Sequence, residues 1–581
     1  MDEKLGHIRH TLAHLLAAAV ENHYPDAKLT LGPAIDTGFY YDIDFGAAKV
    51  TDAELPALEA TMRELLPRWD AFTHAESTPD DARERYTGNA YKTELIDEIA
   101  GRGETITLYT CGGFTDLCRG GHAEHPSKEI SGDSFSLDRV AGAYWRGDEK
   151  NKMLTRIYGL AFATKAELDA FKAQREEAKK RDHRKLGAEL DLFLTSELVG
   201  SGLPLWTPRG TAMRAALDAF VWELREDRGY QRVTIPHITK KDLYETSGHW
   251  AKFADELFRI TTREGKEYAL KPMNCPHHTQ IFARRPFSYR EMPQRYAEST
   301  MVYRDEQSGE LGGLTRVLSI TQDDSHVFCR HSQVKEEFFR IWDIVDTFYG
   351  AFGFSNMRVR LSFHEPSEFE KYLGTKEIWQ NAETALREIA EERKANFFVA
   401  PGEAAMYGPK LDFMAKDSMG REHQVATIQL DMNLPERFDL TCINEKGEKE
   451  RIVMIHCAIM GSFERFMAVM IEHTGGNFAT WLSPVQARVL PVSEKHSEFA
   501  QSVYAALRAA GVRVELDDSD SLGKRVRAAK VAKVPYWVVL GDQEKDAGTV
   551  SAEHREKGKV GTMPLAQFVE MIATEIKERR S

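Results

Sequence analysis

Three arginines stand where they could grip an anionic ligand. Arg304 and Glu306 belong to the run Tyr-Arg-Asp-Glu, Arg316 follows in the next segment, and Arg465 closes the later run Gly-Ser-Phe-Glu-Arg. The planar fork of an arginine matches phosphate and carboxylate oxygens two at a time, so arginines spread over apolar strands favour an anion such as a nucleoside triphosphate. A single Arg-x-Glu is more often a salt bridge, because short motifs recur by chance.

A cysteine and two histidines form a second candidate set. Cys275 lies in Met-Asn-Cys-Pro, His326 ends Thr-Gln-Asp-Asp-Ser-His, and His456 follows Met-Ile. Thiolate sulfur and imidazole nitrogen are ligands that zinc prefers. Spacings this long carry no zinc signature of their own, and a histidine on an apolar strand is more often a satisfied core residue. From spacing alone, both interpretations stay open.

A third set lies near the start of the chain. His10 and His14 are one helical turn apart, so both imidazoles lie on one helix face, and Cys118 and His122 repeat that spacing. Each pair alone is more often a surface pair than a site. Hydrolytic chemistry needs a positioned water and a group that moves protons, and histidine can supply the second.

The elements that position these residues can be predicted from periodicity. Residues 5–23 carry apolar side chains at helical spacing, and 38–43 and 106–109 read as strands, so the region up to about residue 160 is α+β. Residues 165–185 predict a charged helix with a basic end. That end is either a solvated face or a surface for a phosphate backbone.

After residue 187 the arginine motifs lie among strands and helices, which predicts an antiparallel sheet with flanking helices up to about residue 480. In the last hundred residues, strands at 487–492, 512–516 and 537–541 alternate with helices. That alternation predicts βαβ units and a mostly parallel sheet in a separate domain.

The composition limits the class of protein. A chain of 581 residues, 42% hydrophobic and 29% charged, is too long for one core and is globular in composition. It shows no apolar run long enough to cross a bilayer and no signal-peptide core, so we expect a cytoplasmic protein. Its six scattered cysteines predict reduced thiols or metal ligands rather than disulfides. The net charge of −13 argues against nucleic-acid binding over the whole surface but permits a local basic groove.

The order of the motifs resembles that of class II aminoacyl-tRNA synthetases. Pro236, Arg304 with Glu306, and Gly461 with Arg465 stand where that class has its motifs 1, 2 and 3. From residue 5 to about 575 the chain is similar to the threonyl-tRNA synthetase family. The resemblance implies an α+β multidomain fold with an editing domain (1–164), a linker helix (165–186), a class II catalytic domain built on an antiparallel sheet (187–480) and an α/β anticodon-binding domain (481–581).

The resemblance also implies roles for residues of the catalytic domain. Arg304 is expected at the α-phosphate of ATP, and Arg316 and Arg465 at the rest of the nucleotide, with Glu306 reading the adenine edge. The Cys275, His326 and His456 side chains are expected to hold one zinc ion per subunit. The remaining residues of the amino-acid and nucleotide pocket are expected to be Gln322, Asp324, Tyr407, Lys410, Gln424, Gln429 and Ser462.

A zinc ion with open coordination positions could bind the side-chain hydroxyl of threonine, and Asp324 could accept a hydrogen bond from that hydroxyl. Valine lacks that group and would be rejected strongly, but serine differs from threonine only by a methyl group, worth roughly 1 to 3 kcal/mol. A hydrolytic second sieve for seryl-tRNA is therefore expected. The resemblance assigns it to His10, His14, Lys92, Asp116, Cys118 and His122. Whether this site binds metal stays open, and a metal-free site is preferred.

The expected partners are tRNA(Thr), L-threonine, ATP, Mg²⁺ and a second copy of the chain, which would pair through the segment around Pro236. The expected anticodon contacts are Lys524, Arg525, Arg527 and Glu544. Three features depart from the family. Ile320 replaces an aromatic residue under adenine, the usual N-terminal ubiquitin-like domain is missing, and acidic residues at 517–520 and 553 stand where base-reading groups are expected.

Two other functions compete with this interpretation. One is a nucleotide-dependent ligase unrelated to tRNA, and the other is a synthetase-like regulator that binds tRNA without charging it. The complete arginine set and the complete Cys-His-His set favour an active synthetase.

Overall fold

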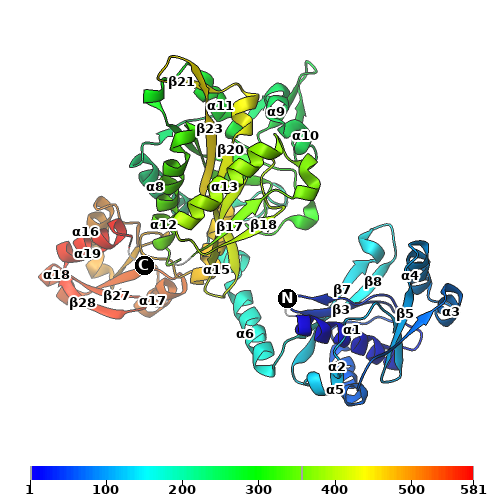
Figure 1. Cartoon of the computed structure of the whole chain (residues 1–581). Helices are drawn as coiled ribbons and strands as arrows, with labels where there is room; N and C mark the ends of the chain where they lie inside the picture. Colours follow the sequence, from blue (N-terminus) through cyan, green and yellow to red (C-terminus); the bar gives the residue numbers. More distant parts are fainter. Residues whose placement is uncertain (1–2, 355–356, 580–581) are drawn as a thin grey trace. The chain divides into compact units, whose positions relative to one another are not determined.

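The chain divides into two compact units, Met1–Glu177 and Ala178–Ser581 (Figure 1). The computed structural model describes residues 3–354 and 357–579. Both units mix helices with strands, which confirms the predicted α+β character. None of the helices within the described ranges is long and apolar enough to cross a membrane. The six cysteines, all within these ranges, form no disulfide.

The first unit is built on a sheet against which a long helix packs. The helix predicted at residues 5–23 is α1 (Glu3–His23), and its Leu12, Leu15 and Leu16 side chains are fully buried. The sheet has the order β1-β3-β8-β7, and β2 also pairs with β3. The other elements of this layer are β1 (Lys28–Leu29), β2 (Ala34–Ile35), β3 (Gly38–Asp44), β7 (Phe135–Tyr144), β8 (Met153–Ala161), α2 (Leu55–Leu65) and α5 (Pro126–Glu129).

A smaller sheet completes the first unit. Its order is β4-β5-β6, and α3 and α4 pack together beside it. Lys92 comes from α4 and Asp116 from β6, so this layer brings both residues to α1. The elements are β4 (Thr73–Ser77), β5 (Ile106–Cys111), β6 (Phe114–Leu117), α3 (Pro79–Arg85) and α4 (Ala90–Gly101).

The predicted linker helix is broken once. Helix α6 (Lys165–Arg181) ends before Asp182, and α7 (His183–Glu189) begins after it. The break has a local cause, because Asp182 leaves helical geometry and its carboxylate accepts a hydrogen bond from the Arg184 amide as an N-cap. His183 is therefore the first residue of a new helix inside the second unit.

The second unit contains the predicted sheet, which is antiparallel except at its two edges. Its order is β11-β15-β16-β23-β20-β19-β17-β18, and only the β11–β15 and β17–β18 pairs are parallel. The strands are β11 (Gln231–Arg232), β15 (Gln294–Tyr303), β16 (Ser319–Cys329), β17 (Arg358–Phe363), β18 (Phe397–Pro401), β19 (Lys410–Lys416), β20 (Glu422–Asp431) and β23 (Val453–Ser462).

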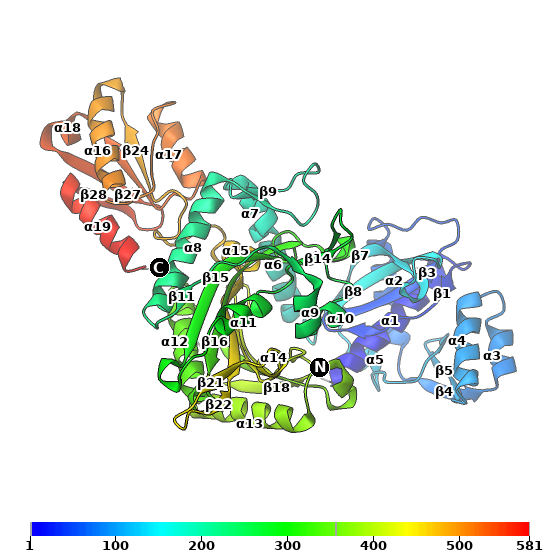
Figure 2. The same cartoon turned by 90° about the horizontal axis from the view of Figure 1, so that it is seen from above.

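Long helices cover one face of this sheet and form the main core with it (Figure 2). They are α8 (Pro208–Glu226), α12 (Val334–Gly350), α13 (Lys376–Glu392) and α15 (Phe463–Thr474). The opposite face carries short elements, which leave room for a cavity. These are α9 (Lys241–Ser247), α10 (His249–Lys252), α11 (Cys275–Ala283), α14 (Asn433–Arg437), β12 (Ile238–Lys240), β13 (Arg259–Thr261), β14 (Glu267–Leu270), β21 (Thr441–Ile443) and β22 (Lys449–Arg451). The pair β9 (Phe193–Leu194) and β10 (Leu205–Trp206) precedes α8.

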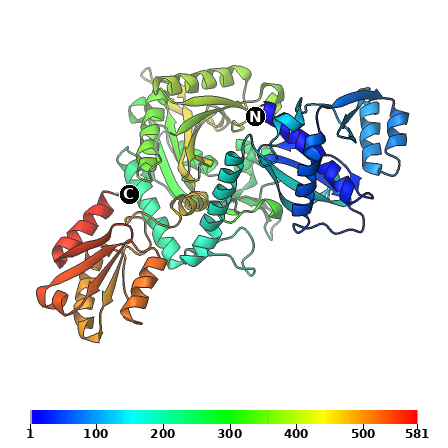
Figure 3. The same ribbon diagram turned by 90° about the horizontal axis from the view of Figure 1, so that it is seen from below.

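The C-terminal domain is a sheet between helices, as the alternation predicted. Its helices lie on both faces of the sheet (Figure 3). Val489 and Val538 pack with α16 and α19, whereas Leu490 and Trp537 pack with α17, so neighbouring side chains of a strand face opposite layers. Strands β25, β24 and β26 pair in parallel, whereas β27 pairs antiparallel with both β26 and β28, and a short turn joins β27 to β28. The elements are β24 (Ala487–Pro491), α16 (Ser497–Ala509), β25 (Val514–Leu516), α17 (Leu522–Val531), β26 (Tyr536–Leu540), α18 (Asp542–Ala547), β27 (Thr549–His554), β28 (Gly558–Pro564) and α19 (Leu565–Lys577).

Candidate functional site

Polar side chains form one row across the main sheet. The pairing of β16 with β23 sets His326 opposite His456, and the pairing of β23 with β20 sets His456 opposite Gln429. Gln429 in turn lies opposite Lys410 of β19. Residues directly opposite each other in a sheet share a face, so four separate segments meet here.

The predicted Cys-His-His set is assembled at one end of this row, and we call it the central cluster. The ligand atoms of Cys275, His326 and His456 all lie within 4.8 Å of one another, and the three residues are buried. Cys275 reaches the row because it opens α11 on the same face of the sheet. The His326 Nε2 and His456 Nδ1 atoms are 3.1 Å apart.

The outer nitrogens of both histidines have other partners. His456 Nε2 lies 2.8 Å from Asp431 Oδ2, and His326 Nδ1 lies 2.8 Å from His278 Nδ1. Such partners fix the ring tautomer and leave the inner nitrogens free to bind a metal. Burial lowers the pKa of His326 well below its usual value, so its ring is neutral. The central cluster can therefore hold a metal ion, and the sequence did not identify Asp431 or His278 as its supports.

Asp324 lies beside the central cluster. Its Oδ1 is 3.7 Å from His326 Nε2, and its Oδ2 accepts a hydrogen bond of 3.0 Å from the Asn274 side chain. Asn274 directly precedes Cys275. The same turn therefore supplies the candidate metal ligand Cys275 and orients the Asp324 carboxylate. Asp324 is thus held where it can accept a hydrogen bond from a small molecule bound at the cluster.

A cavity of about 600 Å³ continues from the row along the sheet. It brings together most of the residues predicted for the nucleotide and amino acid, and Ile320 also lines it. These residues are Arg304, Glu306, Arg316, Gln322, Tyr407, Lys410, Gln424, Gln429, Ser462 and Arg465.

The three arginines concentrate positive charge in this cavity, so an anion bound there would be stabilised. Burial lowers the pKa of Arg465, and the neighbouring charges of Arg304 and Arg316 lower it further. The buried Nε of Arg304 has no hydrogen-bond partner among the residues that the structure describes. Arg316 is held by Glu306, with its Nε 2.8 Å from Oε2, and by Glu310. A polyphosphate would relieve the crowding of Arg304 and Arg465, because its oxygens accept from guanidinium groups.

Several of the pocket side chains are already fixed by protein contacts. Tyr407 donates to Gln429 Oε1 at 2.7 Å and stacks on His456. Gln424 donates to Asp412 and accepts from Arg360.

Ser462 caps α15 by accepting from the Arg465 amide, which sets Arg465 at the mouth of the cavity. These contacts give the cavity a rigid wall.

His249 is a further buried residue near this wall that the sequence did not single out. Its ring lies between Ser247 and Met273, and burial lowers its pKa to about 3, which keeps it neutral. The Gly-His-Trp run around it has no periodicity or spacing that would have marked it.

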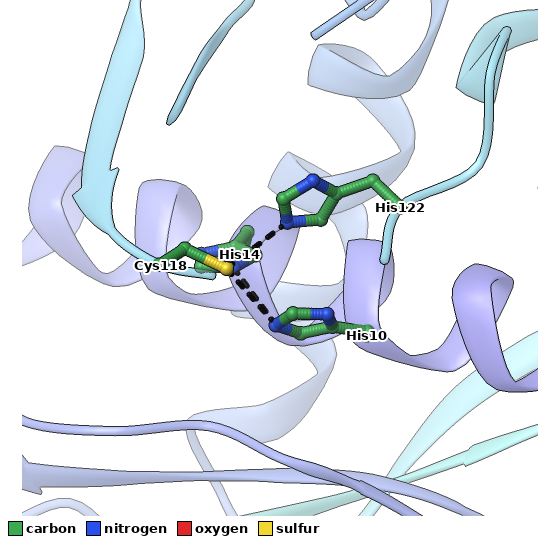
Figure 4. A group of neighbouring side chains, drawn as sticks. All are labelled: His10, His14, Cys118 and His122. Carbon is green, nitrogen blue, oxygen red and sulfur yellow. Dashed lines mark hydrogen bonds between the residues drawn. The ribbon is translucent and has the colours of Figure 1, made fainter. Parts of the chain in front are cut away.

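The first unit brings together the three histidines and the cysteine predicted for the editing site. We call this group, His10, His14, Cys118 and His122, the N-terminal cluster (Figure 4). Cys118 Sγ lies 3.5 Å from His10 Nε2 and 3.4 Å from His122 Nε2, while His10 Nε2 lies 3.2 Å from His14 Nε2. A cavity of about 340 Å³ opens beside it and is also lined by Lys92 and Asp116.

Asp116 is a buried carboxylate that receives three donors. Tyr41 OH donates to Oδ2 at 2.6 Å, and Lys92 Nζ and the Leu117 amide donate to Oδ1. His14 Nδ1 lies 3.2 Å from Oδ2 as a neighbouring charge. Burial alone would raise the pKa of Asp116, but Lys92 and His14 outweigh it and hold that pKa well below its usual value. Tyr41 is a support that the sequence did not indicate.

The carboxylate and the thiol in turn control the charge on His14. Burial alone would lower the pKa of His14, but hydrogen bonds to Asp116 and Cys118 outweigh it and raise that pKa to about 9. Burial would raise the pKa of Cys118, yet His10, His122 and His14 together lower it to about 3. The N-terminal cluster therefore combines a proton-bearing imidazole with a thiolate.

The four predicted anticodon residues have different environments. Lys524 and Arg527 are exposed on α17. Arg525 is only 4% exposed and donates to the Asp517 carbonyl, so it supports the start of that helix. Glu544 accepts from the Gly541 amide and from Ser551 Oγ, so it caps α18.

Comparison with known families divides the chain in the same order. Residues 106–158 match the family described as the threonyl and alanyl tRNA synthetase second additional domain. Residues 258–474 match the tRNA synthetase class II core domain (G, H, P, S and T), and residues 486–575 match an anticodon binding domain. The cavity on the main sheet is lined almost entirely by the matched class II core, whereas the N-terminal cavity takes only part of its lining, Thr107 and Asp116–Gly120, from the matched segment.

Full-length relatives are similar over nearly the whole chain. A threonine–tRNA ligase of Porphyromonas gingivalis is 48% identical over 575 residues, which cover 98% of this chain and 87% of the relative. A threonine–tRNA ligase of Thermus thermophilus is 48% identical over 589 residues, covering 98% and 89%. Among solved structures, the RNA binding domain of threonyl-tRNA synthetase from Cryptosporidium parvum superimposes with a TM-score of 0.65 at 38% identity, covering 68% of this chain and 98% of that one.

The buried Asp116 network leads to a stability prediction. Replacing Lys92 with Met leaves a buried carboxylate without its main cation, and we expect the free energy of unfolding of the first unit to fall by about 3 kcal/mol. Tyr41→Phe removes one of three donors and should cost about 1 kcal/mol. Hydrogen exchange of the β5 and β6 amides in the full chain measures both values. Equal costs for the two variants would contradict the dominant role of Lys92.

Proposed function

This chain belongs to the threonyl-tRNA synthetase family, and from that membership we propose that it attaches L-threonine to tRNA(Thr) with ATP and hydrolyses mischarged seryl-tRNA(Thr). The observation that carries this proposal is that Arg304 and Arg465 line one cavity with Lys410 and Gln429, which belong to the row that ends in the central cluster. An anion site beside a site that can hold a small amino acid suits the joining of that amino acid to a nucleotide.

We assign the functions to four segments. Residues 1–164 edit, 165–186 link, 187–480 catalyse aminoacylation, and 481–581 bind the anticodon. The three family matches support this order. In the last segment, Lys524 and Arg527 are the better candidates for phosphate or base contacts, because Arg525 and Glu544 are engaged within the domain.

ATP would be held by the arginines. Arg304 contacts the α-phosphate with its unpartnered donor, and Arg465 contacts the remaining nucleotide. Arg316 must exchange its ion pair with Glu306 for phosphate, which leaves Glu306 free to accept from the adenine amine. Mg²⁺ is expected to neutralise the remaining triphosphate charge.

The central cluster fits zinc. One sulfur and two imidazole nitrogens converge, and the outer nitrogens are held by Asp431 and His278. A zinc ion held by Cys275, His326 and His456 would supply positions to which the amine and hydroxyl of threonine could bind. Asp324 accepts from that hydroxyl, so valine leaves an acceptor of this half-buried carboxylate unpaired and is rejected.

The reaction proceeds in two steps in one cavity. A carboxylate oxygen of threonine attacks the α-phosphate, the bond to the β-phosphate breaks, and threonyl-adenylate and pyrophosphate form. Arg304 stabilises the charge on the α-phosphate as it develops. A ribose hydroxyl of the terminal adenosine of tRNA then attacks the carbonyl carbon, and AMP leaves. Gln322 and Lys410 line the same cavity and orient the carboxylate.

Serine passes the hydroxyl test, so correction falls to the N-terminal cluster. Its cavity is lined by His10, Lys92 and Cys118, which can position a water molecule and move protons during ester hydrolysis. The two chemistries are thus kept in separate cavities. The segment around Pro236 is expected to pair two copies of the chain, as motif 1 does in this class.

A threonine-dependent ATP–pyrophosphate exchange assay tests the main proposal. The purified chain should exchange pyrophosphate into ATP only when threonine is present. Valine should give a rate lower by about 10⁴-fold, because its binding leaves polar groups unpaired. Exchange without threonine would indicate an unrelated ligase, and no exchange would indicate a regulator.

The zinc site can be tested by metal content. Wild-type protein should carry about one zinc per chain, Cys275→Ser should carry almost none, and Asp431→Asn should bind zinc about 10 to 100-fold more weakly. Cys442→Ala removes another buried cysteine and serves as the matched control. If Cys275→Ser kept both its zinc and its threonine-dependent exchange, the assignment would be wrong.

The editing proposal predicts a separation of activities. A His10→Ala, His14→Ala double variant should charge threonine within about twofold of wild type, yet lose roughly 100-fold or more in seryl-tRNA deacylation, since general acid–base groups contribute on that scale. His125→Ala, at an exposed histidine of the same unit, is the control. Unchanged deacylation by the double variant would refute the role of these histidines.

A further inference from the structure

The loop that carries Arg316 is a tight turn anchored by one residue. The Gly312 amide donates to the Arg316 carbonyl at 3.1 Å, and the Thr315 amide donates to the Gly312 carbonyl at 2.9 Å. Leu314, inside this turn, is 1% exposed and packs in the main core. Thr315 and Arg316 line the nucleotide cavity. The buried position of Leu314 therefore fixes the backbone from which the Arg316 side chain extends into the cavity.

Leu314 is also held by a hydrogen bond of its backbone amide. Its buried backbone N–H donates to His183 Nε2 at 3.0 Å. A backbone amide can only donate, so Nε2 must carry a lone pair and the ring proton must lie on Nδ1. His183 Nδ1 is 2.6 Å from Glu472 Oε1, which accepts that proton. The carboxylate thus selects the one tautomer that can hold the loop.

Glu472 is itself fixed by further contacts. Its Oε1 also accepts from the His183 backbone amide at 3.2 Å, and its Oε2 accepts from Arg421. Glu472 belongs to α15, the helix whose first turn carries Arg465. Arg465 Nε donates to the Thr315 carbonyl at 3.3 Å. One helix therefore holds the loop at two adjacent residues, directly at Thr315 and through His183 at Leu314.

The loop backbone lies directly against the imidazole. Gly313 has φ of +56°, a region that favours glycine, and a Cβ there would lie 2.3 Å from His183 Nε2. Asp182, His183 and Glu472 also have the spacing of a metal site, since their ligand atoms lie within 4.8 Å of one another. Both ring nitrogens of His183 are used by Leu314 and Glu472, so this group serves to hold the loop.

We propose that His183 is a positioning residue for ATP: with Glu472 it fixes the tautomer that holds Leu314, and so it places Arg316 at the nucleotide cavity. The inference rests on the proposed function only in the identity of the anion as ATP. His183 does not touch the nucleotide. It acts on the loop, so its loss should weaken ATP binding and leave threonine recognition by Asp324 and the central cluster unchanged.

Two substitutions distinguish the roles of the two ring nitrogens of His183. The amide of His183→Gln can place an oxygen acceptor near Nε2, whereas that of His183→Asn can place a donor only near Nδ1 and cannot reach Leu314. We expect His183→Asn to raise the KM for ATP about 3 to 10-fold, the worth of one hydrogen bond. The KM for threonine and the zinc content should stay within twofold of wild type. His183→Gln should restore most of the ATP affinity.

Gly313→Ala provides a second route to the same loop. Its Cβ pushes the turn off the ring, so it should raise the KM for ATP at least as much as His183→Asn. Lys185→Gln, at an exposed residue of α7, is the matched control. The dissociation constant of ATP, measured by calorimetry without threonine, gives a readout that does not require the exchange activity.

The outcomes separate this inference from the proposed function. Selective weakening of ATP binding by His183→Asn and Gly313→Ala, with rescue by His183→Gln, supports the inference. Equal changes for ATP and threonine, or a lower melting temperature with unchanged ATP binding, overturn it. A wild-type chain that binds ATP without threonine-dependent exchange would overturn the proposed function, and the calorimetric comparison would still decide the role of His183.

Discussion

The register between β16 and β23 is the constraint on which the catalytic site depends. It sets His326 opposite His456, and a slip by one residue would turn one histidine into the helical core. Asp323 pins this register from the other face, because its carboxylate accepts from the Ile459 and Met460 amides and pairs with Arg225 of α8. The register shifts between Gln322 and Asp324, at the strand positions that face the cavity. A buried ion pair on the helical side thus fixes the residues on the substrate side.

Helix α15 positions two parts of the nucleotide cavity, namely Arg465 and the loop that carries Arg316. Its first turn presents Arg465, whose amide is capped by Ser462, and its last turns present Glu472 to His183. A rigid helix of the main core therefore sets two separate contacts to the loop of Arg316. Since the helix packs on β16 and β23, the geometry of the anion site and that of the central cluster share one scaffold. The sites that we propose for ATP and for threonine are then aligned by packing rather than by flexible loops.

Much of this arrangement could be predicted from residue types and spacing. The helix with His10 and His14 follows from apolar periodicity, whereas the arginine and Cys-His-His sets could be assigned only through the resemblance to the class II synthetases. The supports could not be predicted, because Asp431, Tyr41 and His183 act across segments far apart in sequence, and single buried polar residues have no periodic signal. The break before His183 depends on the capping of Asp182 within a charged stretch that otherwise reads as one helix. Likewise, periodicity could not show that Arg525 turns inward, because its position on α17 is compatible with either environment.

The two histidine clusters differ in the charge that surrounds them, and this difference separates their chemistry. In the central cluster burial keeps His326 neutral, and its outer nitrogen faces another imidazole, so a lone pair is available for a metal. In the N-terminal cluster His14 Nδ1 lies 3.2 Å from Asp116 Oδ2 and its Nε2 lies 3.2 Å from His10 Nε2, and Asp116 and Cys118 together raise its pKa to about 9. A metal would have to displace a proton that Asp116 stabilises, with Lys92 close by as a second positive charge. The N-terminal cluster therefore places a proton-bearing imidazole beside a thiolate, the kind of group that the proposed ester hydrolysis needs for moving protons.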